Sequence, residues 1–275
     1  MILFPNCKIN LGLRILRRRP DGYHDIATVM YPTDWCDILE ITPSKDGETH
    51  LVTTGNPVDC PPEKNLVMKA YNAVKQLFPS LPAVEINLHK IIPDGAGLGG
   101  GSADASFTIL GLNEIFNLGL DKSQMAEIAA GIGADCPFFI YNRPLLATGI
   151  GEIFSETEVD LTGYHLLIVK PQSSVSTKEA YAGVTPRDGG ISPAKIVKSD
   201  VSCWKNSLVN DFEDSLFPNH PEIEAVKTKL YELGAVYASM TGSGAAVYGI
   251  FRELGDAEKA QKAFDGFRAC FIRNN

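Results

Sequence analysis

The chain contains 275 residues, of which 44% are hydrophobic and 21% charged, and 25 basic against 33 acidic side chains give a net charge of −8. This composition is typical of a globular protein with one large domain or two ordinary ones. Because the balance is acidic, we expect neither nucleic-acid binding nor attachment to an anionic membrane. An anionic ligand must therefore be held by local groups.

The six cysteines are scattered without the spacing of a metal site, and the five histidines show no metal pattern. We therefore expect reduced thiols and no protein-bound metal centre. The sequence has no apolar run of membrane-spanning length, and it opens on a strand pattern rather than a basic start and an apolar run. These features favour a cytoplasmic protein.

The first element predicted is a half-buried strand over residues 8–16, where apolar and polar side chains alternate. Its polar face places Lys8 beside Asn10. The sequence Pro-Asp-Gly at 20–22 predicts a turn, after which Tyr23 and His24 begin a returning strand. Further strands are expected at 36–42 and 50–54, followed by a helix over 63–78 that ends at prolines.

A glycine-rich loop at 93–106, PDGAGLGGGSADAS, organises the middle of the chain. It follows an alternating strand at 83–89 and precedes a helical pattern at 105–118. Glycines permit positive φ and close approach of backbone amides to an anion, and a helix N-terminus adds a positive dipole end. Strand, glycine loop and helix together predict a phosphate-binding site.

Several nucleotide-binding templates compete for this loop. Residues 95–100 satisfy the G-x-G-x-x-G dinucleotide fingerprint, but the second strand ending in an acidic residue is missing, since 123–132 also has a helical pattern. A P-loop requires a lysine after its last glycine, and a protein-kinase loop requires a following V-A-I-K strand. The sequence contains neither at this place.

The rest of the chain predicts a second α+β unit. Asp121 and Gln124 form a capping-box pattern at the start of the helix over 123–132, which Gly133 is expected to close. Asp135 follows it, and the composition around 143–163 suggests a domain boundary. Later elements are expected as strands at 164–170, 235–239 and 245–251, an exposed loop at 185–195, and helices at 221–233 and 256–267. A second glycine turn, Thr241–Gly244, lies between the last two strands.

Three separated motifs, Lys8-Ile9-Asn10-Leu11, PDGAGLGGGSADAS and SMTGSGAAV, together resemble the GHMP kinase superfamily. The runs RRRPDGYHDI, GLGGGSAD and IGADCPFF are similar to those of its 4-diphosphocytidyl-2-C-methyl-D-erythritol kinase family. The resemblance covers essentially the whole chain. It implies a two-domain α+β GHMP-kinase-like fold, with an N-terminal ATP-binding domain at 1–150 and a C-terminal ferredoxin-like α/β sandwich at 151–275.

The resemblance also implies a reaction, its cofactors and its site residues. The expected reaction transfers a phosphoryl group from ATP, with Mg²⁺, to the 2-hydroxyl of a cytidine diphosphate-linked methylerythritol in isoprenoid precursor synthesis. Asp135 would be the catalytic base and Lys8 its partner. The residues implied for ATP are Asn65, Lys90, Pro93, Gly95, Gly97, Leu98, Gly99, Gly100, Gly101 and Ser102. Those implied for the acceptor substrate are Asn10, Tyr23, His24, Tyr181, Thr241 and Gly242.

Three alternatives remain at this point. Another kinase of the same superfamily, acting on homoserine or mevalonate, would need no cytidine pocket and so leaves the RRRPDGYH run unexplained. A catalytically inactive nucleotide-binding regulator would not need both Lys8 and Asp135. A dehydrogenase is a distant third possibility, which a nicotinamide-binding assay would separate. Asp94, an acidic residue within the loop, is expected to point outward.

Overall fold

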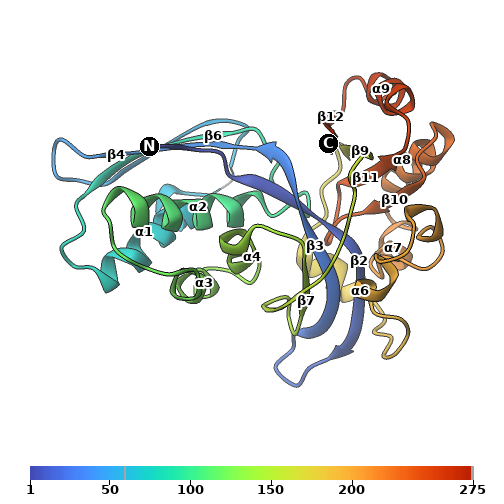
Figure 1. Cartoon of the computed structure of the whole chain (residues 1–275), viewed down its shortest axis with the longest axis horizontal. Coiled ribbons are helices and arrows are strands. Elements are labelled where there is room, and N and C mark those ends of the chain that lie inside the picture. Colours follow the sequence, from blue (N-terminus) through green and yellow to red (C-terminus); the bar gives the residue numbers. More distant parts are fainter. Residues whose placement is uncertain (59, 274–275) are drawn as a thin grey trace. The chain divides into compact units, whose positions relative to one another are not determined.

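A computed structural model describes residues 1–58 and 60–273 of the chain (Figure 1). They form two compact units, each assembled from three chain segments. The first unit contains residues 1–7, 34–94 and 99–143, and the second contains residues 8–33, 95–98 and the chain from 144 onward. The sequence-continuous domains at 1–150 and 151–275 remain a prediction, because the compact units follow spatial contact rather than chain order.

The first unit is built on a four-stranded sheet with the order β1-β4-β6-β5. Strand β5 runs parallel to β6, whereas the pairs β1–β4 and β4–β6 are antiparallel. The strands are β1 (Ile2–Leu3), β4 (Ile38–Pro43), β5 (His50–Gly55) and β6 (Val84–Lys90). Alternate residues of β4 and β6 are buried, as the period of two predicted for 83–89 requires.

Helices α1 and α2 lie along one face of this sheet (Figure 1). They share a hydrophobic core with it, in which Val67 and Ile109 are both fully buried. The helical segments are η1 (Pro62–Lys64), α1 (Leu66–Leu77), α2 (Gly100–Ile115), α3 (Lys122–Ala130) and α4 (Cys136–Tyr141). The predicted order of strand, glycine loop and helix is confirmed, but α2 begins at Gly100 and ends at Ile115, so it starts within the predicted loop and ends before residue 118.

Three details of the first unit differ from or refine the prediction. The helix expected at 63–78 is interrupted at Asn65, whose extended backbone ends η1 and caps α1. The capping box of Asp121 and Gln124 is confirmed, but α3 ends at Ala130 with Gly131 as its C-cap, so Gly133 does not close it. The short helix α4 was not predicted, because Pro137 and an apolar run of six residues carry no helical period.

The second unit begins with the sheet β2-β3-β7-β8. The Pro-Asp-Gly turn joins its first two strands and is confirmed, with Gly22 at φ +89° donating its amide hydrogen to the carbonyl of Arg19. The strands are β2 (Asn6–Arg18), β3 (His24–Cys36), β7 (Leu145–Thr148) and β8 (Ile153–Glu156). The region 143–163, interpreted as a boundary, thus contains two short strands.

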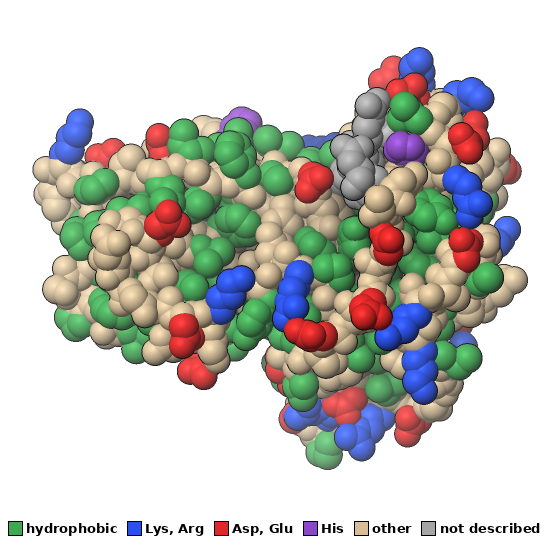
Figure 2. Space-filling view, in the orientation of Figure 1, with side chains coloured by type: hydrophobic (Ala, Val, Ile, Leu, Met, Phe, Trp, Pro, Cys, Tyr) green, Lys and Arg blue, Asp and Glu red, His purple; other side chains and the backbone are tan. Residues whose placement is uncertain are grey.

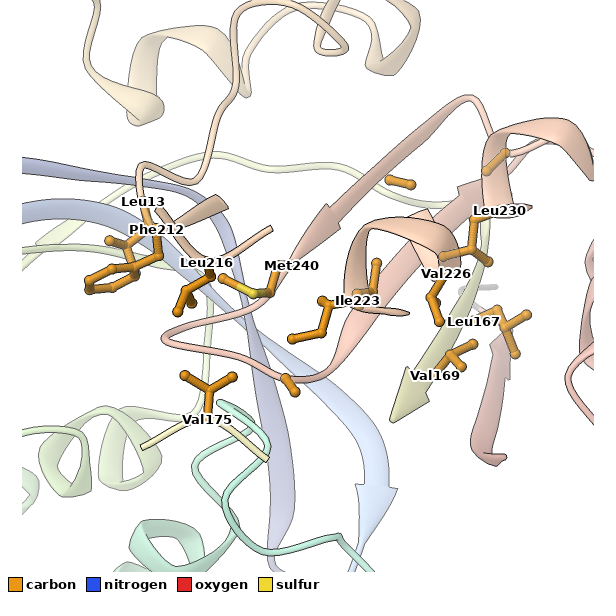
Figure 3. Packing of buried hydrophobic residues seen from close by; sticks show 14 of the residues in the cluster. Leu13, Leu167, Val169, Val175, Phe212, Leu216, Ile223, Val226, Leu230 and Met240 are labelled. Atoms are coloured by element: carbon orange, nitrogen blue, oxygen red, sulfur yellow. The ribbon is translucent and has the colours of Figure 1, made fainter. Parts of the chain in front are cut away.

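A second antiparallel sheet, with the order β10-β11-β9-β12, completes this unit. Helices α8 and α9 pack against it, and Figure 3 shows Ile223, Val226 and Leu230 of α8 facing Leu167 and Val169 of β9. The strands are β9 (His165–Lys170), β10 (Tyr237–Met240), β11 (Val247–Phe251) and β12 (Arg268–Arg273). The helices are α5 (Thr177–Gly183), α6 (Pro193–Ile196), η2 (Val201–Cys203), α7 (Glu213–Leu216), α8 (Pro221–Glu232) and α9 (Leu254–Ala263).

This architecture confirms the expected α+β class, with an α/β sandwich in the C-terminal part. Among the described residues, none of the helices is both long and apolar enough to cross a membrane. On the face shown in Figure 2, acidic and basic side chains are interspersed over the right-hand part of the view.

Candidate active site

The glycine loop has the backbone conformation that the sequence predicted. Gly95, Gly97 and Gly99 have φ values of +59°, +73° and +72°, which residues with a side chain rarely adopt. Gly99 is the N-cap of α2, and Gly100 and Gly101 form its first turn. A Cβ atom added at Gly95 would meet no atom within 4 Å, so this side of the loop is open to a ligand.

The start of α2 is suited to an anion. The first amide groups of a helix lack intrahelical partners, and the helix dipole places positive charge there. No acidic residue occupies the first turn of α2, which contains Gly100, Gly101 and Ser102. Asp94 is exposed, as expected, while Pro93 before it is buried. The local charge therefore favours phosphate at this helix end.

The first half of the loop packs against the second glycine turn. A Cβ atom on Gly97 would overlap the carbonyl oxygen of Thr241, and one on Gly242 would lie 3.0 Å from the Cα and carbonyl oxygen of Gly97. The amide of Ala246 donates to the carbonyl of Ala96 at 3.2 Å. Two backbone turns can approach this closely only because both are made of glycine at the point of contact.

Lys8 lies beneath these turns and is 3% exposed. Its Nζ donates to the side-chain oxygen of Asn10 at 2.6 Å and to the carbonyl oxygen of Gly97 at 3.1 Å. Its backbone amide donates to the carbonyl of Leu98 at 3.0 Å. These bonds join β2 to the glycine loop through both the backbone and the side chain of Lys8.

Asn10 and Thr241 extend this network. The Oγ1 of Thr241 accepts the amide of Asn10 at 3.0 Å and lies 3.3 Å from both the Asn10 side-chain oxygen and the Gly97 carbonyl. The side-chain nitrogen of Asn10, Nδ2, donates to Thr28 Oγ1 at 3.0 Å. The structure thus brings together Lys8, Asn10, Gly97 and Thr241. It adds Thr28, which the sequence did not indicate because it lies on the partner strand.

Asp135 belongs to the first unit and occupies the N-cap position of α4, where it is half-buried. The hydroxyl of Ser106 donates to the carbonyl of Cys136 at 2.7 Å and to that of Ser102 at 2.9 Å. This hydroxyl ties the start of α4 to α2, so Asp135 is held by the helix that begins at the glycine loop. The pairing of Asp135 with Lys8, which lies in the second unit, remains a prediction.

Lys90 lies at the end of β6 and is 5% exposed. Its Nζ donates to Asp37 and to the Oδ2 of Asp104, the latter at 2.6 Å. The Oδ1 of Asp37 also accepts the amides of Ile91 and Ile92, which lead into the glycine loop. Lys90 therefore anchors β6, the loop entry and α2 to one another, and its direct contact with ATP remains a prediction.

This cluster of Asp37, Lys90 and Asp104 contains two carboxylates for one ammonium. Burial lowers the pKa of Lys90, but the two carboxylates outweigh it and hold that pKa above its usual value. Burial, opposed in part by Lys90, raises the pKa of Asp104 to about 7. The Oδ1 of Asp104 has no hydrogen-bond partner among the described residues. Neither aspartate was predicted, since they lie 53 and 14 positions from Lys90 and follow no local pattern.

Asn65 borders a cavity of about 350 Å³ in the first unit. Its side-chain oxygen accepts the amide of Val67 at 3.0 Å and so starts α1. The cavity wall also contains residues of β5 and of the segment before η1: Leu51, Thr53, Thr54, Gly55, Asn56, Pro57, Val58, Cys60 and Pro62. Mixed apolar and amide groups of this kind are typical of a small-molecule site.

The aromatic residues implied for the acceptor lie near the β2–β3 turn. The rings of His24 and Tyr181 are stacked, with centroids 5.0 Å apart and 25° between their planes. Tyr181 also meets Phe212 edge to face. Burial first, and then Arg18, lower the pKa of His24, so its ring is neutral at pH 7. Tyr23 is 61% exposed. The structure thus brings His24 and Tyr181 together and leaves the Tyr23 ring open to solvent.

The described residues contain no group of three His, Cys, Asp or Glu side chains that could hold a metal ion.

Comparison with known families agrees with this geometry. Residues 65–143 match the GHMP kinases N terminal domain and residues 194–268 match the GHMP kinases C terminal domain. The 4-diphosphocytidyl-2-C-methyl-D-erythritol kinase of Parabacteroides distasonis is 51% identical over 92% of both chains. The enzyme of the same name from Bacteroides fragilis is 51% identical over 91% of this chain and 92% of its own.

Solved structures give the same result. A crystal structure of 4-(cytidine 5'-diphospho)-2C-methyl-D-erythritol kinase superposes with a TM-score of 0.85 and 30% identity, covering 99% of this chain and 98% of the other. The mevalonate kinase of Methanococcus jannaschii shares the fold alone, with a TM-score of 0.74 at 15% identity over 100% of this chain and 98% of its own. The chain belongs to the 4-diphosphocytidyl-2-C-methyl-D-erythritol kinase family of the GHMP kinases.

Proposed function

We propose that this chain transfers the γ-phosphoryl group of ATP to the 2-hydroxyl of 4-diphosphocytidyl-2-C-methyl-D-erythritol, in the synthesis of isoprenoid precursors. The observation that carries the proposal is the Lys8 network, in which a buried ammonium donates to the Asn10 side chain and to the glycine loop at Gly97. Family membership supports the choice of acceptor, because relatives that carry this name share about half of their residues with the chain.

Lys8 supplies positive charge where the reaction develops negative charge. The Asn10 side-chain oxygen and the Gly97 carbonyl accept from the ammonium and help to hold it in place. A preorganised charge in a water-poor site stabilises a developing oxyanion more strongly than the same charge in water. We assign Lys8 this role at the acceptor hydroxyl.

Asp135 is assigned the role of general base. In the step, the acceptor oxygen forms a bond to the γ-phosphorus as the bond between that phosphorus and the leaving ADP oxygen breaks. The hydroxyl proton passes to the Asp135 carboxylate. A tertiary alcohol is a poor nucleophile, and a positioned carboxylate accelerates such a transfer by about 10²–10⁴-fold.

ATP binding is assigned to the glycine loop and the first unit. The open side of Gly95, the positive φ values and the first turn of α2 fit a polyphosphate chain, and the cavity beside Asn65 fits a base. Mg²⁺ would accompany the ATP phosphates and neutralise part of their charge. Lys90, with Asp37, would hold the loop entry in place below the phosphates.

The cytidine end of the acceptor is assigned to Tyr23, His24 and Tyr181. The exposed Tyr23 ring offers a free face for a base, and the neutral His24 ring can hydrogen-bond its polar edge. Thr241 and Gly242 lie against Gly97, and so would face the part of the acceptor nearest the reacting phosphate.

The first experiment measures ADP release with three acceptors in parallel: the cytidine substrate, mevalonate and homoserine. We expect ATP-dependent turnover with the cytidine substrate and turnover lower by at least about 10³-fold with the other two, because only the first engages a nucleobase pocket. Equal turnover with mevalonate would contradict the proposed acceptor, but it would still be consistent with a small-molecule kinase.

A second experiment tests the base. We expect Asp135→Asn to lower kcat by about 10²–10⁴-fold while the affinity for the acceptor changes only a few-fold, since the amide keeps the shape of the carboxylate but accepts no proton. The exposed Asp214→Asn in the second unit is the matched control. Near-normal turnover of folded Asp135→Asn would exclude Asp135 as the base.

A further inference from the structure

The segment from Val209 to Glu213 carries three polar side chains that are almost entirely buried. The exposed fractions of Asn210, Asp211 and Glu213 are 2%, 6% and 7%. Buried polar groups require hydrogen-bond partners, and burial of three such residues within four positions is costly unless all are satisfied. Their hydrogen-bond partners all lie in the second unit, on β2, β10, α8, the second glycine turn and the segment itself.

The side chain of Asn210 binds the backbone of that turn. Its Nδ2 donates to the carbonyl oxygens of Met240 and Gly242, at 2.8 and 2.9 Å. Its Oδ1 accepts the amide of Phe212 at 3.1 Å. An asparagine offers two N–H donors and one acceptor oxygen on a planar group, and here all of them are used. An aspartate of the same shape would place an acceptor against two carbonyls.

The backbone on either side of Asn210 is bound to β2, the strand that carries Lys8 and Asn10. The amide of Leu13 donates to the carbonyl of Val209, and the amide of Asp211 donates to the carbonyl of Leu13, both at 2.8 Å. These two bonds make Asn210 a bridge partner of Leu13. The main chain of Asn210 is thus fixed on β2 while its side chain holds the turn.

The neighbouring acidic residues strengthen both attachments. Asp211 Oδ2 accepts the amide of Ile15 at 2.8 Å, further along β2. Glu213 Oε1 accepts the amide of Met240 at 2.8 Å, at the residue before the turn. Figure 3 shows Leu13, Phe212 and Met240 close together in the same part of the core. The segment therefore clamps β2 to the end of β10.

The clamped turn is the one that contacts the Lys8 network. Thr241 Oγ1 accepts the amide of Asn10, and the Thr241 and Gly242 backbones pack directly on Gly97. Gly97 in turn supplies the carbonyl that accepts from Lys8. A displacement of Gly242 would therefore move Gly97 and change the position of the ammonium.

We propose that Asn210 is a positioning residue for phosphoryl transfer, which fixes the Thr241–Gly244 turn against β2 and thereby sets the geometry of Lys8 and Gly97. This inference rests on the proposed function for the identity of the reaction. Because Asn210 is 2% exposed and its side chain is bound to the protein backbone, we assign it no direct contact with either substrate. Its effect on turnover passes through the turn, and a misplacement of about 1 Å in such a site lowers rates by about 10²-fold.

The test compares Asn210→Asp, the milder Asn210→Ser, and the matched control Asn219→Asp. Asn219 is exposed and its Nδ2 also donates to a backbone carbonyl, that of Ser215 at 3.4 Å. For each folded variant, kcat and KM are measured per active site, and hydrogen–deuterium exchange is followed at residues 240–244 and at β9. Asn210→Ser keeps one hydrogen-bond donor, its hydroxyl group, and replaces Asn210→Asp in the test if that variant does not fold.

We expect kcat to fall by about 10- to 100-fold in Asn210→Asp and less in Asn210→Ser, with KM for ATP changed less than 3-fold. Exchange should accelerate at 240–244 and stay unchanged in β9. The double variant Asn210→Asp with Thr241→Val should be about as slow as the slower single variant, because both act through one turn. Asn219→Asp should behave as wild type.

A lower melting temperature with unchanged kcat per active site would assign Asn210 a structural role and overturn the proposal. Multiplicative loss in the double variant, or unchanged exchange at 240–244, would also overturn it. A wild-type protein that releases no ADP with the cytidine substrate would contradict the proposed function. The exchange measurement would then still decide whether Asn210 fixes the turn.

Discussion

Lys8 and Lys90 are both buried lysines that contact the backbone or side chains around the glycine loop, yet the groups that accept their hydrogen bonds differ. Lys8 donates to a side-chain amide oxygen and a backbone carbonyl, whereas Lys90 donates to two carboxylates. Lys90 thus links two acidic side chains of the first unit, whereas the hydrogen bonds of Lys8 to Asn10 and Gly97 attach it to the glycine loop. We therefore predict a structural role for Lys90 and a role in the reaction for Lys8, although both are buried.

The largest effect is expected on stability when Lys90 is removed. Lys90→Met leaves Asp37 and Asp104 buried beside each other without a counter-charge, which should lower the free energy of unfolding by about 3–5 kcal/mol. Urea unfolding measures this, with the exposed Lys69→Met on α1 as control. A loss no larger than that of the control would mean that the cluster does not hold the loop entry.

The same cluster predicts a pH dependence. Because the pKa of Asp104 is about 7 in the folded protein and near 4 when unfolded, the folded state binds the extra proton between these values. Its contribution to stability is therefore complete below pH 4 and is lost as pH rises towards 7, by at most about 1.4 kcal/mol per pH unit. Asp104→Asn should flatten this part of the curve, and an unchanged slope would contradict the assignment.

A single substitution adds a carboxylate next to Lys8. Asn10→Asp places this carboxylate at the position of the Asn10 oxygen, which lies 2.6 Å from the Lys8 ammonium in the native protein. We expect kcat to fall by about 10- to 100-fold, less than complete loss of a stabilising donor, because the ammonium stays in place while the local positive charge falls. Steady-state kinetics measure this, with Asn219→Asp as control. Unchanged kcat would show that the net charge at Lys8 is irrelevant.

The smallest effect concerns the choice of acceptor, which neither lysine decides. Tyr23→Ala removes an exposed ring. It should weaken binding of the cytidine substrate by about 0.5–1.5 kcal/mol, or roughly 2- to 12-fold in affinity, and leave the affinity for ATP unchanged. Titration of each ligand separately measures this. Equal weakening of both ligands would assign Tyr23 to packing of the turn rather than to the cytidine pocket.

Local patterns in the sequence predicted much of this fold. The glycine loop and α2 were predicted because a run of glycines stands between a strand pattern and a helical pattern, and the structure shows the positive φ values that glycine permits. The capping box at Asp121 was predicted because its two side chains, Asp121 and Gln124, lie within four residues. Elements without a clear hydrophobic periodicity were missed, namely α4 beside Asp135 and the strands β7 and β8. The break before α1 at Asn65 was also missed.

The candidate site was predicted less completely, for a physical reason. Resemblance to a family indicated Lys8, Asn10 and Thr241, and the structure brings them together in the second unit. The groups that support them are distant in sequence. Asp37 and Asp104 follow no pattern that points to Lys90, and Asn210 lies in a polar run that resembles an exposed loop until its partners in the turn are seen.

The most direct test of this account measures single-turnover phosphoryl transfer to the cytidine substrate by Lys8→Met and Lys90→Met, at a temperature where both are folded. We expect Lys8→Met to be slower than wild type by about 10²–10³-fold, the usual cost of removing a preorganised donor, and Lys90→Met to stay within about 3-fold. Equal losses in the two variants, or a larger loss in Lys90→Met, would contradict the division between a lysine that acts on the reaction and one that holds the fold.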